Sequence, residues 1–302
     1  MKRTIKMANL LFLLMLPAQM ALADQFGDGL AAYRAGDYST ALRMWLPLAE
    51  GGDASAEYNV GVLYDNGAGT SKDYVEAAKW YRKAADQGDP AAQNNLANLY
   101  LDGTGVPQSY DDAFMWFSKS AAQQFVQAEN ALGGMYVRGL RGPKDCPEAI
   151  KWFLTAADQG YLESQYNLGV AYRVGCPDLR DYTEAMKWFR KAAEQGDSRA
   201  KFGIGVMYEL GQGVQKSDED AFKWYVDAAQ AGSISGENNL GTMYRNGRGT
   251  PQDYVQAYKW FSLAAAAGDT AAMSNRDALA HVMTLDQISQ AQKLIQGWKP
   301  VQ

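Results

Sequence analysis

Tryptophan recurs along this chain at a constant interval of 36 residues. The series consists of Trp80, Trp116, Trp152, Trp188, Trp224 and Trp260. Tyrosine, glycine and alanine keep the same step, beginning with Tyr64, Gly67 and Ala77. A strict period of this length indicates a solenoid, in which each repeat packs only against its neighbours. Because no linker interrupts the series, we expect one elongated domain.

Each unit contains two stretches in which apolar residues follow helical spacing. Ala56, Val60 and Tyr64 mark a first helix, which Gly67 is expected to end in the left-handed conformation. The stripe from Ala77 to Ala85 marks a second, amphipathic helix. An aspartate, Asp89 in this unit, then caps the helix that begins the next unit. The predicted fold is all-α, built of helix-loop-helix repeats.

Small residues in the first helices predict close packing between helices. Position 61 and its equivalents read Gly61, Ala97, Gly133, Gly169, Gly205 and Gly241. Glycine inside a helix costs about 1 kcal/mol relative to alanine, so a close neighbour is needed to explain it. We expect that neighbour to be the ring of Trp80 or its equivalents. A second aromatic residue follows each of these tryptophans, and we interpret the paired rings as core, not as a ligand cage.

The first 23 residues have the pattern of a secretory signal peptide. Lys2, Arg3 and Lys6 precede an apolar run from Leu10 to Leu16, and Ala21-Leu22-Ala23 is a small-residue cleavage signal. The run is too short to span a bilayer, so we expect cleavage after Ala23 and no membrane insertion. The predicted location is the periplasm or the medium outside the cell.

Charge and composition disfavour several classes of function. Loss of the signal peptide changes the formal net charge from −5 to −8, and no Lys/Arg stripe follows. Such an acidic chain is a poor binder of nucleic acid or anionic membranes. His281 is the single histidine, so neither a metal site nor a histidine-based catalytic set is expected. We expect no cofactor and a monomeric state.

At the repeated positions the chain resembles the Sel1-like repeat proteins, relatives of the tetratricopeptide repeats. The resemblance is clearest in Tyr166-Asn167-Leu168-Gly169 and in the run from Ala185 to Gly196. It assigns 54–269 to six repeats, with a divergent first helix pair at 24–53 and capping helices at 270–302. The resemblance implies a right-handed α-solenoid that binds other proteins, and it supplies no catalytic residues.

Two adjacent repeats lack the Gly-x-Gly sequence that the other loops carry. Their loops read Gly139-Leu140-Arg141-Gly142 and Gly175-Cys176-Pro177. Both cysteines of the chain, Cys146 and Cys176, lie in or beside these loops. In an exported protein two cysteines are expected to form a disulfide, here between neighbouring repeats. In the chain-entropy model, closing such a loop stabilises the fold by about 3–4 kcal/mol.

A hydrolase is the alternative to a binding protein. Ser198-Arg199-Ala200-Lys201 matches the S-x-x-K nucleophile motif of penicillin-binding enzymes, which would act on β-lactams or peptidoglycan. However, roughly 0.7 such matches arise by chance in a chain of this composition, and no K-T-G sequence accompanies it. We therefore expect no enzyme activity.

The binding residues are expected on the first helices, because the resemblance implies that these line the concave face. An asparagine recurs beside the core stripe, at Asn59, Asn95, Asn167 and Asn239. Its amides could pair with the backbone of an extended peptide, or instead hold the pitch of the superhelix by bonding neighbouring elements. Next to this row, Tyr58, Tyr166 and Phe202 are candidate aromatic anchors for a protein or peptide partner.

Overall fold

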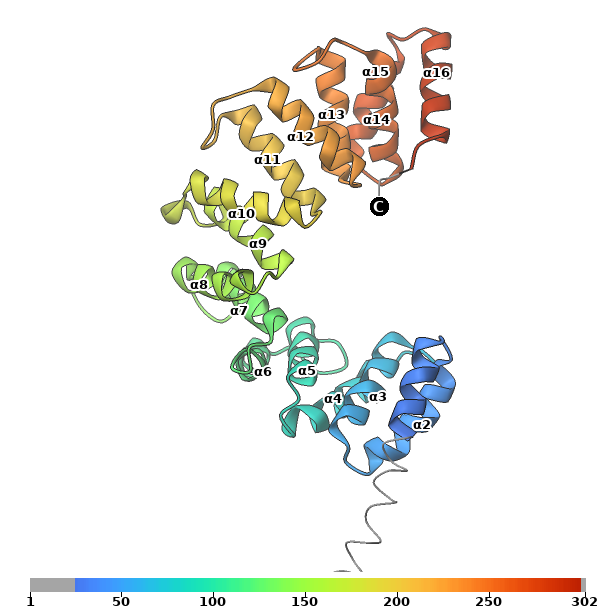
Figure 1. The fold of residues 1–302 in the computed structure, drawn as a ribbon, viewed down its shortest axis with the longest axis vertical. Helices are drawn as coiled ribbons and strands as arrows, with labels where there is room; N and C mark the ends of the chain where they lie inside the picture. Colours follow the sequence, from blue (N-terminus) through green and yellow to red (C-terminus); the bar gives the residue numbers. More distant parts are fainter. Residues whose placement is uncertain (1–24, 300–302) are drawn as a thin grey trace, which may run out of the picture. The chain divides into compact units, whose positions relative to one another are not determined.

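A computed structural model describes residues 25–299, and these form helices and loops with no β-strand in that range (Figure 1). The predicted signal peptide lies outside the described residues. Most helices contact the helix that follows them in the chain. The all-helical solenoid fold predicted from the 36-residue period is confirmed.

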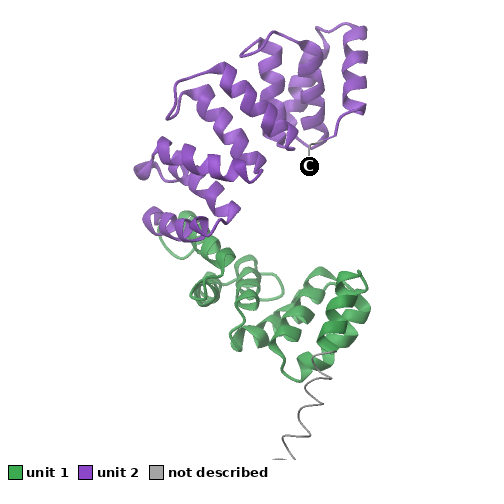
Figure 2. Cartoon of the chain, in the orientation of Figure 1, with its two compact units in different colours: residues 1–144 green, residues 145–302 purple. Residues whose placement is uncertain are grey.

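Contacts between helices divide the chain into two compact units, one ending at Lys144 and one beginning at Asp145 (Figure 2). In the first unit residues 25–34 are helical. Further helices follow: α2 (Tyr38–Glu50), α3 (Ala54–Asn66), α4 (Tyr74–Asp86), α5 (Pro90–Asp102), α6 (Tyr110–Ala121) and α7 (Val126–Arg138).

The second unit repeats the same alternation of first and second helices. Its elements are α8 (Cys146–Asp158), α9 (Leu162–Val170), a π-helical turn (Ala171–Gly175), a 3₁₀ turn (Pro177–Leu179), α10 (Tyr182–Glu194), α11 (Ser198–Leu210), α12 (Asp218–Gln230), α13 (Ile234–Asn246), α14 (Tyr254–Ala266), α15 (Thr270–Ala280) and α16 (Leu285–Gln296).

The helix boundaries follow from the capping residues seen in the sequence. Asp53 and Asp89 accept hydrogen bonds from the backbone N–H groups of Ala56 and Ala92, at 2.8 and 2.7 Å. Gly67 ends α3 with φ of 67°, the left-handed conformation that glycine adopts without strain. The predicted stop and cap positions are confirmed.

The rings of the second helices form the core, but the glycines of the first helices meet a different ring from the one expected. A Cβ atom on Gly61 would lie 2.7 Å from Cδ1 of Tyr81, and one on Gly169 would lie 2.4 Å from Cδ1 of Phe189. The close neighbour is therefore the aromatic residue after each tryptophan, not the tryptophan itself. The reason is helix phase: residue 81 is rotated by about 100° from residue 80 and points at α3.

The second glycine of each Gly-x-Gly loop packs against the preceding repeat. A Cβ atom on Gly105 would lie 2.2 Å from the carbonyl oxygen of Tyr74, the first residue of α4. Only a residue without a side chain fits so close to that backbone. In the loop with Arg141 in this position, the contact is instead an ion pair between Arg141 Nε and Asp111 Oδ1, 2.7 Å apart.

Candidate functional site

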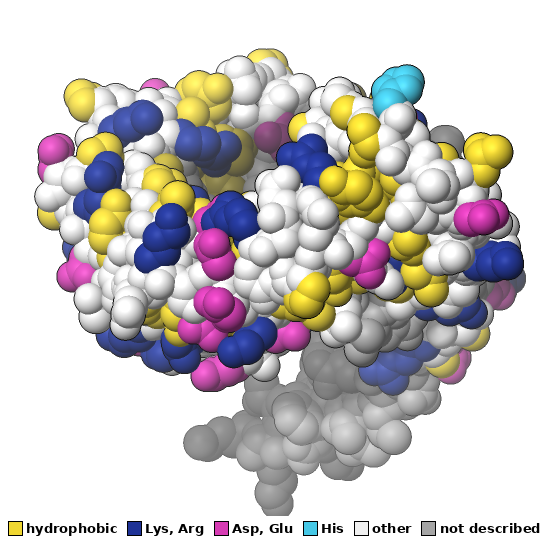
Figure 3. All heavy atoms as spheres, turned by 90° about the horizontal axis from the view of Figure 1, so that it is seen from above, with side chains coloured by type: hydrophobic (Ala, Val, Ile, Leu, Met, Phe, Trp, Pro, Cys, Tyr) yellow, Lys and Arg dark blue, Asp and Glu magenta, His cyan; other side chains and the backbone are white. Residues whose placement is uncertain are grey.

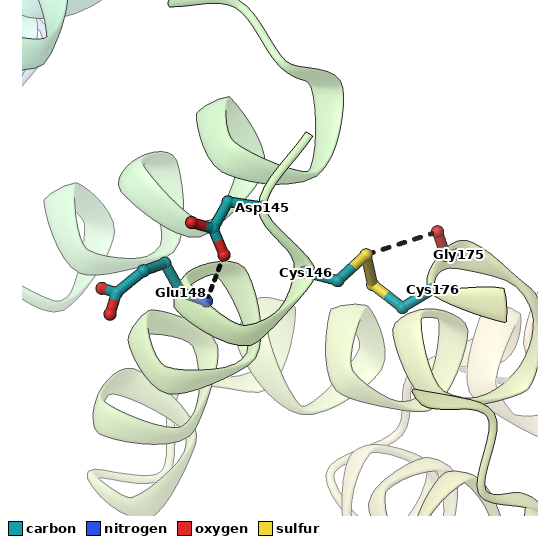
Figure 4. The surroundings of a disulfide bond; sticks show 5 residues. All are labelled: Asp145, Cys146, Glu148, Gly175 and Cys176. Atoms are coloured by element: carbon teal, nitrogen blue, oxygen red, sulfur yellow. Dashed lines mark hydrogen bonds between the residues drawn. A yellow bond between two sulfur atoms is a disulfide. The ribbon is translucent and has the colours of Figure 1, made fainter. Parts of the chain in front are cut away.

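Cys146 and Cys176 form a disulfide within the second unit, with their Cα atoms 5.7 Å apart (Figure 4). Cys146 is the first residue of α8, whose N-terminus is capped by Asp145 through a 3.0 Å bond from the Glu148 N–H. Cys176 is buried in the loop after α9. The predicted disulfide is confirmed, and it links one repeat to the next through the middle residue of the loop, the position that Thr104 and Arg248 hold in other repeats.

The disulfide coincides with an altered helix end. The first helix α9 has 9 residues, whereas α11 has 13. Beyond α9 the chain forms the π-helical turn that ends at Gly175, and Gly175 does not take the left-handed φ of Gly211. The loop that carries Cys176 therefore leaves the repeat by a different path from its equivalents.

The three candidate aromatic anchors occupy equivalent places on first helices. Each is half-buried and packs on the ring that follows the tryptophan of the second helix. The ring pairs are Tyr58–Tyr81, Tyr166–Phe189 and Phe202–Tyr225, with centroids 6.0, 6.0 and 5.7 Å apart. One side of each anchor thus belongs to the core, and part of each ring is accessible.

Tyr166 is also covered by a charged cluster. The Arg199 guanidinium lies 4.2 Å from the centre of the Tyr166 ring. Arg199 Nη2 forms ion pairs with Glu163 Oε2 at 2.7 Å and with Asp197 Oδ2 at 2.6 Å. Burial raises the pKa of the Tyr166 phenol, and the Arg199 charge opposes that rise. This anchor therefore combines an aromatic ring with a cation and carboxylates.

The asparagine row divides into two kinds of position. Burial raises the pKa of Tyr58 and Tyr81, and a hydrogen bond with the Asn95 side chain opposes that rise in both phenols. Asn239 has the same relation to Tyr225. These two amides support buried tyrosines, which favours the structural interpretation for them. Asn59 and Asn167 are half-buried. They follow the anchors Tyr58 and Tyr166 in the chain, and these anchors pack on Tyr81 and Phe189.

Carboxylates beside two of these tyrosines escaped the sequence analysis. The Tyr81 hydroxyl donates to Asp65 at 3.0 Å, and the Tyr225 hydroxyl donates to Glu209 at 2.5 Å. The signal was present in the repeats: position 65 and its equivalents are acidic only where the second-helix ring is tyrosine and not phenylalanine.

The S-x-x-K residues lie on the first turn of α11. Asp197 caps this helix, and both Ser198 and Lys201 are half-buried. Within residues 25–299 the Ser198 hydroxyl and the Lys201 ammonium form no hydrogen bond with each other.

The surface offers no region of a single charge sign on the face drawn in Figure 3, where Lys and Arg side chains are interspersed with Asp and Glu. No three His, Cys, Asp or Glu side chains gather closely enough to hold a metal ion in the described part of the chain. No helix within residues 25–299 is both long and apolar enough to cross a membrane.

Comparisons with known proteins agree with the repeat geometry. The family model described as Sel1 repeat matches residues 16–53, 54–89, 90–125, 126–161, 162–197, 198–233 and 234–269. A Sel1 repeat protein from Oxalobacter formigenes is 34% identical, with a TM-score of 0.73, covering 80% of this chain and 99% of its own. Protein c5321, a protective antigen of uropathogenic Escherichia coli with an SLR fold, is 30% identical, with a TM-score of 0.52, covering 90% of this chain and 67% of its own. A search of curated proteins found no match.

Proposed function

Because this chain belongs to the Sel1 repeat family, we propose that it is a non-catalytic scaffold that binds a protein or peptide. Members of this family are typically protein–protein interaction scaffolds. The proposed binding surface is the concave face that the first helices are expected to line. The observation that carries this proposal is the row of half-buried anchors on those helices, Tyr58, Tyr166 and Phe202.

The anchors suit an interface because each packs against a core ring while the residue stays partly exposed. A ring fixed against Phe189 or Tyr225 loses little conformational freedom on binding. Aromatic residues and arginine dominate the binding energy of protein interfaces, and Tyr166 with Arg199 provides both. Asn167 stands beside Tyr166 on α9 and is a candidate for pairing with the partner's backbone.

We place the protein in the periplasm or outside the cell. The disulfide between Cys146 and Cys176 supports an oxidising compartment, where such bonds persist. N-terminal sequencing of the protein from the native envelope or culture medium tests this placement. A chain beginning at Asp24 is expected, and a chain that keeps Met1 and is recovered with reduced cysteines from the cytosol would contradict it.

The binding surface is tested by affinity purification with crosslinking from the envelope of the native organism. The double variant Tyr166→Ala with Asn167→Ala is expected to weaken binding of the recovered partner about tenfold or more, because it removes a central anchor and its neighbouring amide. Lys151→Ala with Thr155→Ala, two exposed positions on α8, is the matched control and should bind normally. A double variant that melts several degrees lower and still binds once folded would place the site elsewhere.

We propose no catalytic role for Ser198 and Lys201. Purified protein is expected not to hydrolyse nitrocefin. Turnover that disappears in Ser198→Ala would overturn the non-catalytic assignment and establish the hydrolase alternative.

A further inference from the structure

A long side chain in the middle of a loop can reach the preceding repeat, and Arg248 shows how. Its guanidinium lies between two carboxylates of that repeat, with Nη1 2.9 Å from Glu209 Oε1 and Nη2 2.6 Å from Asp218 Oδ1. Glu209 is in turn held by the hydroxyl of buried Tyr225. The second unit therefore contains a built site for a guanidinium, and the chain's own arginine fills it.

The first unit repeats part of this arrangement 144 residues, or four repeats, earlier in the chain, with Tyr74 at the position of Asp218. Asp65 corresponds to Glu209, and the hydroxyl of buried Tyr81 donates to it at 3.0 Å, as Tyr225 does to Glu209. Asn95 corresponds to Asn239, and each amide bonds the local tyrosine. No other repeat combines these groups, since the positions equivalent to Asp65 elsewhere are Leu101, Val137, Arg173 and Arg245.

The two copies also differ at the residue that occupies the site. Thr104 stands where the second unit has Arg248, and its short side chain cannot extend to the carboxylate. A surface pocket of about 290 Å³ lies here, lined by Asp65, Tyr74, Asn95, Asn98, Asp102 and Thr104 among others. This volume equals that of several water molecules, enough for a planar guanidinium.

The pocket also has the charge that a cation requires. Asp102 adds a second carboxylate at a position where the second unit has Asn246, and no Lys or Arg is among the lining residues. Lys72 does not line the pocket: its ammonium donates to the Tyr74 hydroxyl at 2.9 Å and lies over that ring, although its charge also interacts with Asp65. The amide oxygens of Asn95 and Asn98 can accept further N–H groups of a bound cation.

We propose that the pocket at Asp65 binds the guanidinium of an arginine side chain on a protein partner. This arginine takes the place that Arg248 occupies in the second unit. The inference rests on the proposed function for the nature of the partner, but the pocket itself can be tested without one. Arginine is preferred to lysine because its planar fork can pair with Asp65 while other N–H groups meet Asp102 or the amides.

The probe for this pocket is Nα-acetyl-arginine methylamide, titrated into the ¹⁵N-labelled mature chain and followed by NMR. Saturable shifts are expected at Asn95, Asn98 and Thr104. The citrulline analogue has the same shape without the charge and should bind about tenfold more weakly, as should the protein with Asp65→Asn. The lysine analogue should also bind more weakly than arginine. Equal shifts from arginine and citrulline, or shifts that survive Asp65→Asn unchanged, would overturn the proposal.

Exchanging the residues of the two copies provides an independent test. Thr104→Arg should fill the pocket, abolish probe binding and raise the melting temperature, and Asp65→Asn should cancel that gain. Arg248→Thr should open a second probe site at Glu209, which Asp65→Asn leaves intact. If Thr104→Arg leaves probe binding unchanged, the pocket does not bind guanidinium. Such a failure leaves the scaffold proposal standing, because that proposal is tested through Tyr166 and Asn167 on α9.

Discussion

Gly169 lies inside α9 with the ring of Phe189 in the space that a Cβ atom would take. A Cβ atom there would meet Cδ1 of that ring at 2.4 Å, whereas one on Gly134 in α7 would meet only the end of the Arg138 side chain, at 3.6 Å. We expect Gly169→Ala to destabilise the protein by about 1–3 kcal/mol through overpacking. Gly134→Ala should stabilise it by up to about 1 kcal/mol through helix propensity. Thermal or urea unfolding measures both, and equal effects of the two substitutions would contradict this packing.

A buried carboxyl group makes stability depend on pH. Glu237 is 4% exposed, and burial raises the pKa of its carboxyl to about 7, against the opposing charge of Lys259. In other repeats a glutamine donates to the equivalent side chain, as Gln87 does to Glu57 at 2.7 Å, but here that position is Ala267. The folded pKa is above the unfolded one, so the native state holds the proton more tightly and loses stability as pH rises from about 4.5 to above 7.

Glu237→Gln should remove this loss. We expect the variant to be more stable than the parent by about 1–3 kcal/mol at pH 8 and nearly equal to it at pH 5. Ala267→Gln should also flatten the pH dependence, because it supplies the donor that Gln87 provides to Glu57. Melting temperatures at the two pH values test both variants. A Glu237→Gln variant with the parent's pH dependence would assign the effect to another group.

At the scale of the element, the periodic residues predicted the helices and their ends. The stop at Gly67 and the cap at Asp89 depend on local backbone chemistry, so the sequence was sufficient for them. The prediction that the ring of Trp80 meets Gly61 was wrong. Trp80 and Tyr81 are adjacent and differ only in the direction they point around the helix, and the packing of the two helices decides which ring faces Gly61. The sequence did not predict the shortened α9, because the path of the loop that follows it is associated with the disulfide and not with helix propensity.

The candidate site was also predictable only in part, because some of its contacts depend on how neighbouring helices pack. The register of Tyr58, Tyr166 and Phe202 on the first helices is a property of the repeat and could be read from the sequence. Which asparagines support a buried tyrosine depends on the ring that faces them from the preceding second helix. Tyr81 and Tyr225 carry a hydroxyl that Phe189 lacks, so Asn95 and Asn239 have a partner that the periodic pattern alone did not reveal.

The disulfide is expected to stabilise the contact between α8 and the loop that follows α9. Cys146 and Cys176 are 30 residues apart, and removal of a native disulfide of this kind costs about 2–4 kcal/mol. Cys146→Ala with Cys176→Ala should therefore melt at a lower temperature than the oxidised parent. A reductant should lower the parent to the same value and leave the double variant unchanged. A parent that melts at the same temperature with and without reductant would show that the bond contributes nothing to stability.

At the scale of the whole molecule, a repeat protein gains its stability from interfaces between neighbours. Most helices contact mainly the helices next to them in the chain, while α16 packs on α14. Damage to one repeat should accordingly remain local, unlike damage to a globular core, which lowers the stability of every element together. The two compact units provide matched positions at which this difference can be measured.

Phe117 in α6 and Phe261 in α14 are equivalent residues four repeats apart, and both are fully buried. Truncating either ring to alanine should cost about 3–5 kcal/mol at its own interfaces. In hydrogen-exchange mass spectrometry, Phe117→Ala should speed exchange in α5, α6 and α7 while α13, α14 and α15 keep the parent's rates. Phe261→Ala should give the reverse pattern. If either substitution instead speeds exchange to the same extent in all helices, the chain unfolds as one cooperative domain and nearest-neighbour packing does not describe its stability.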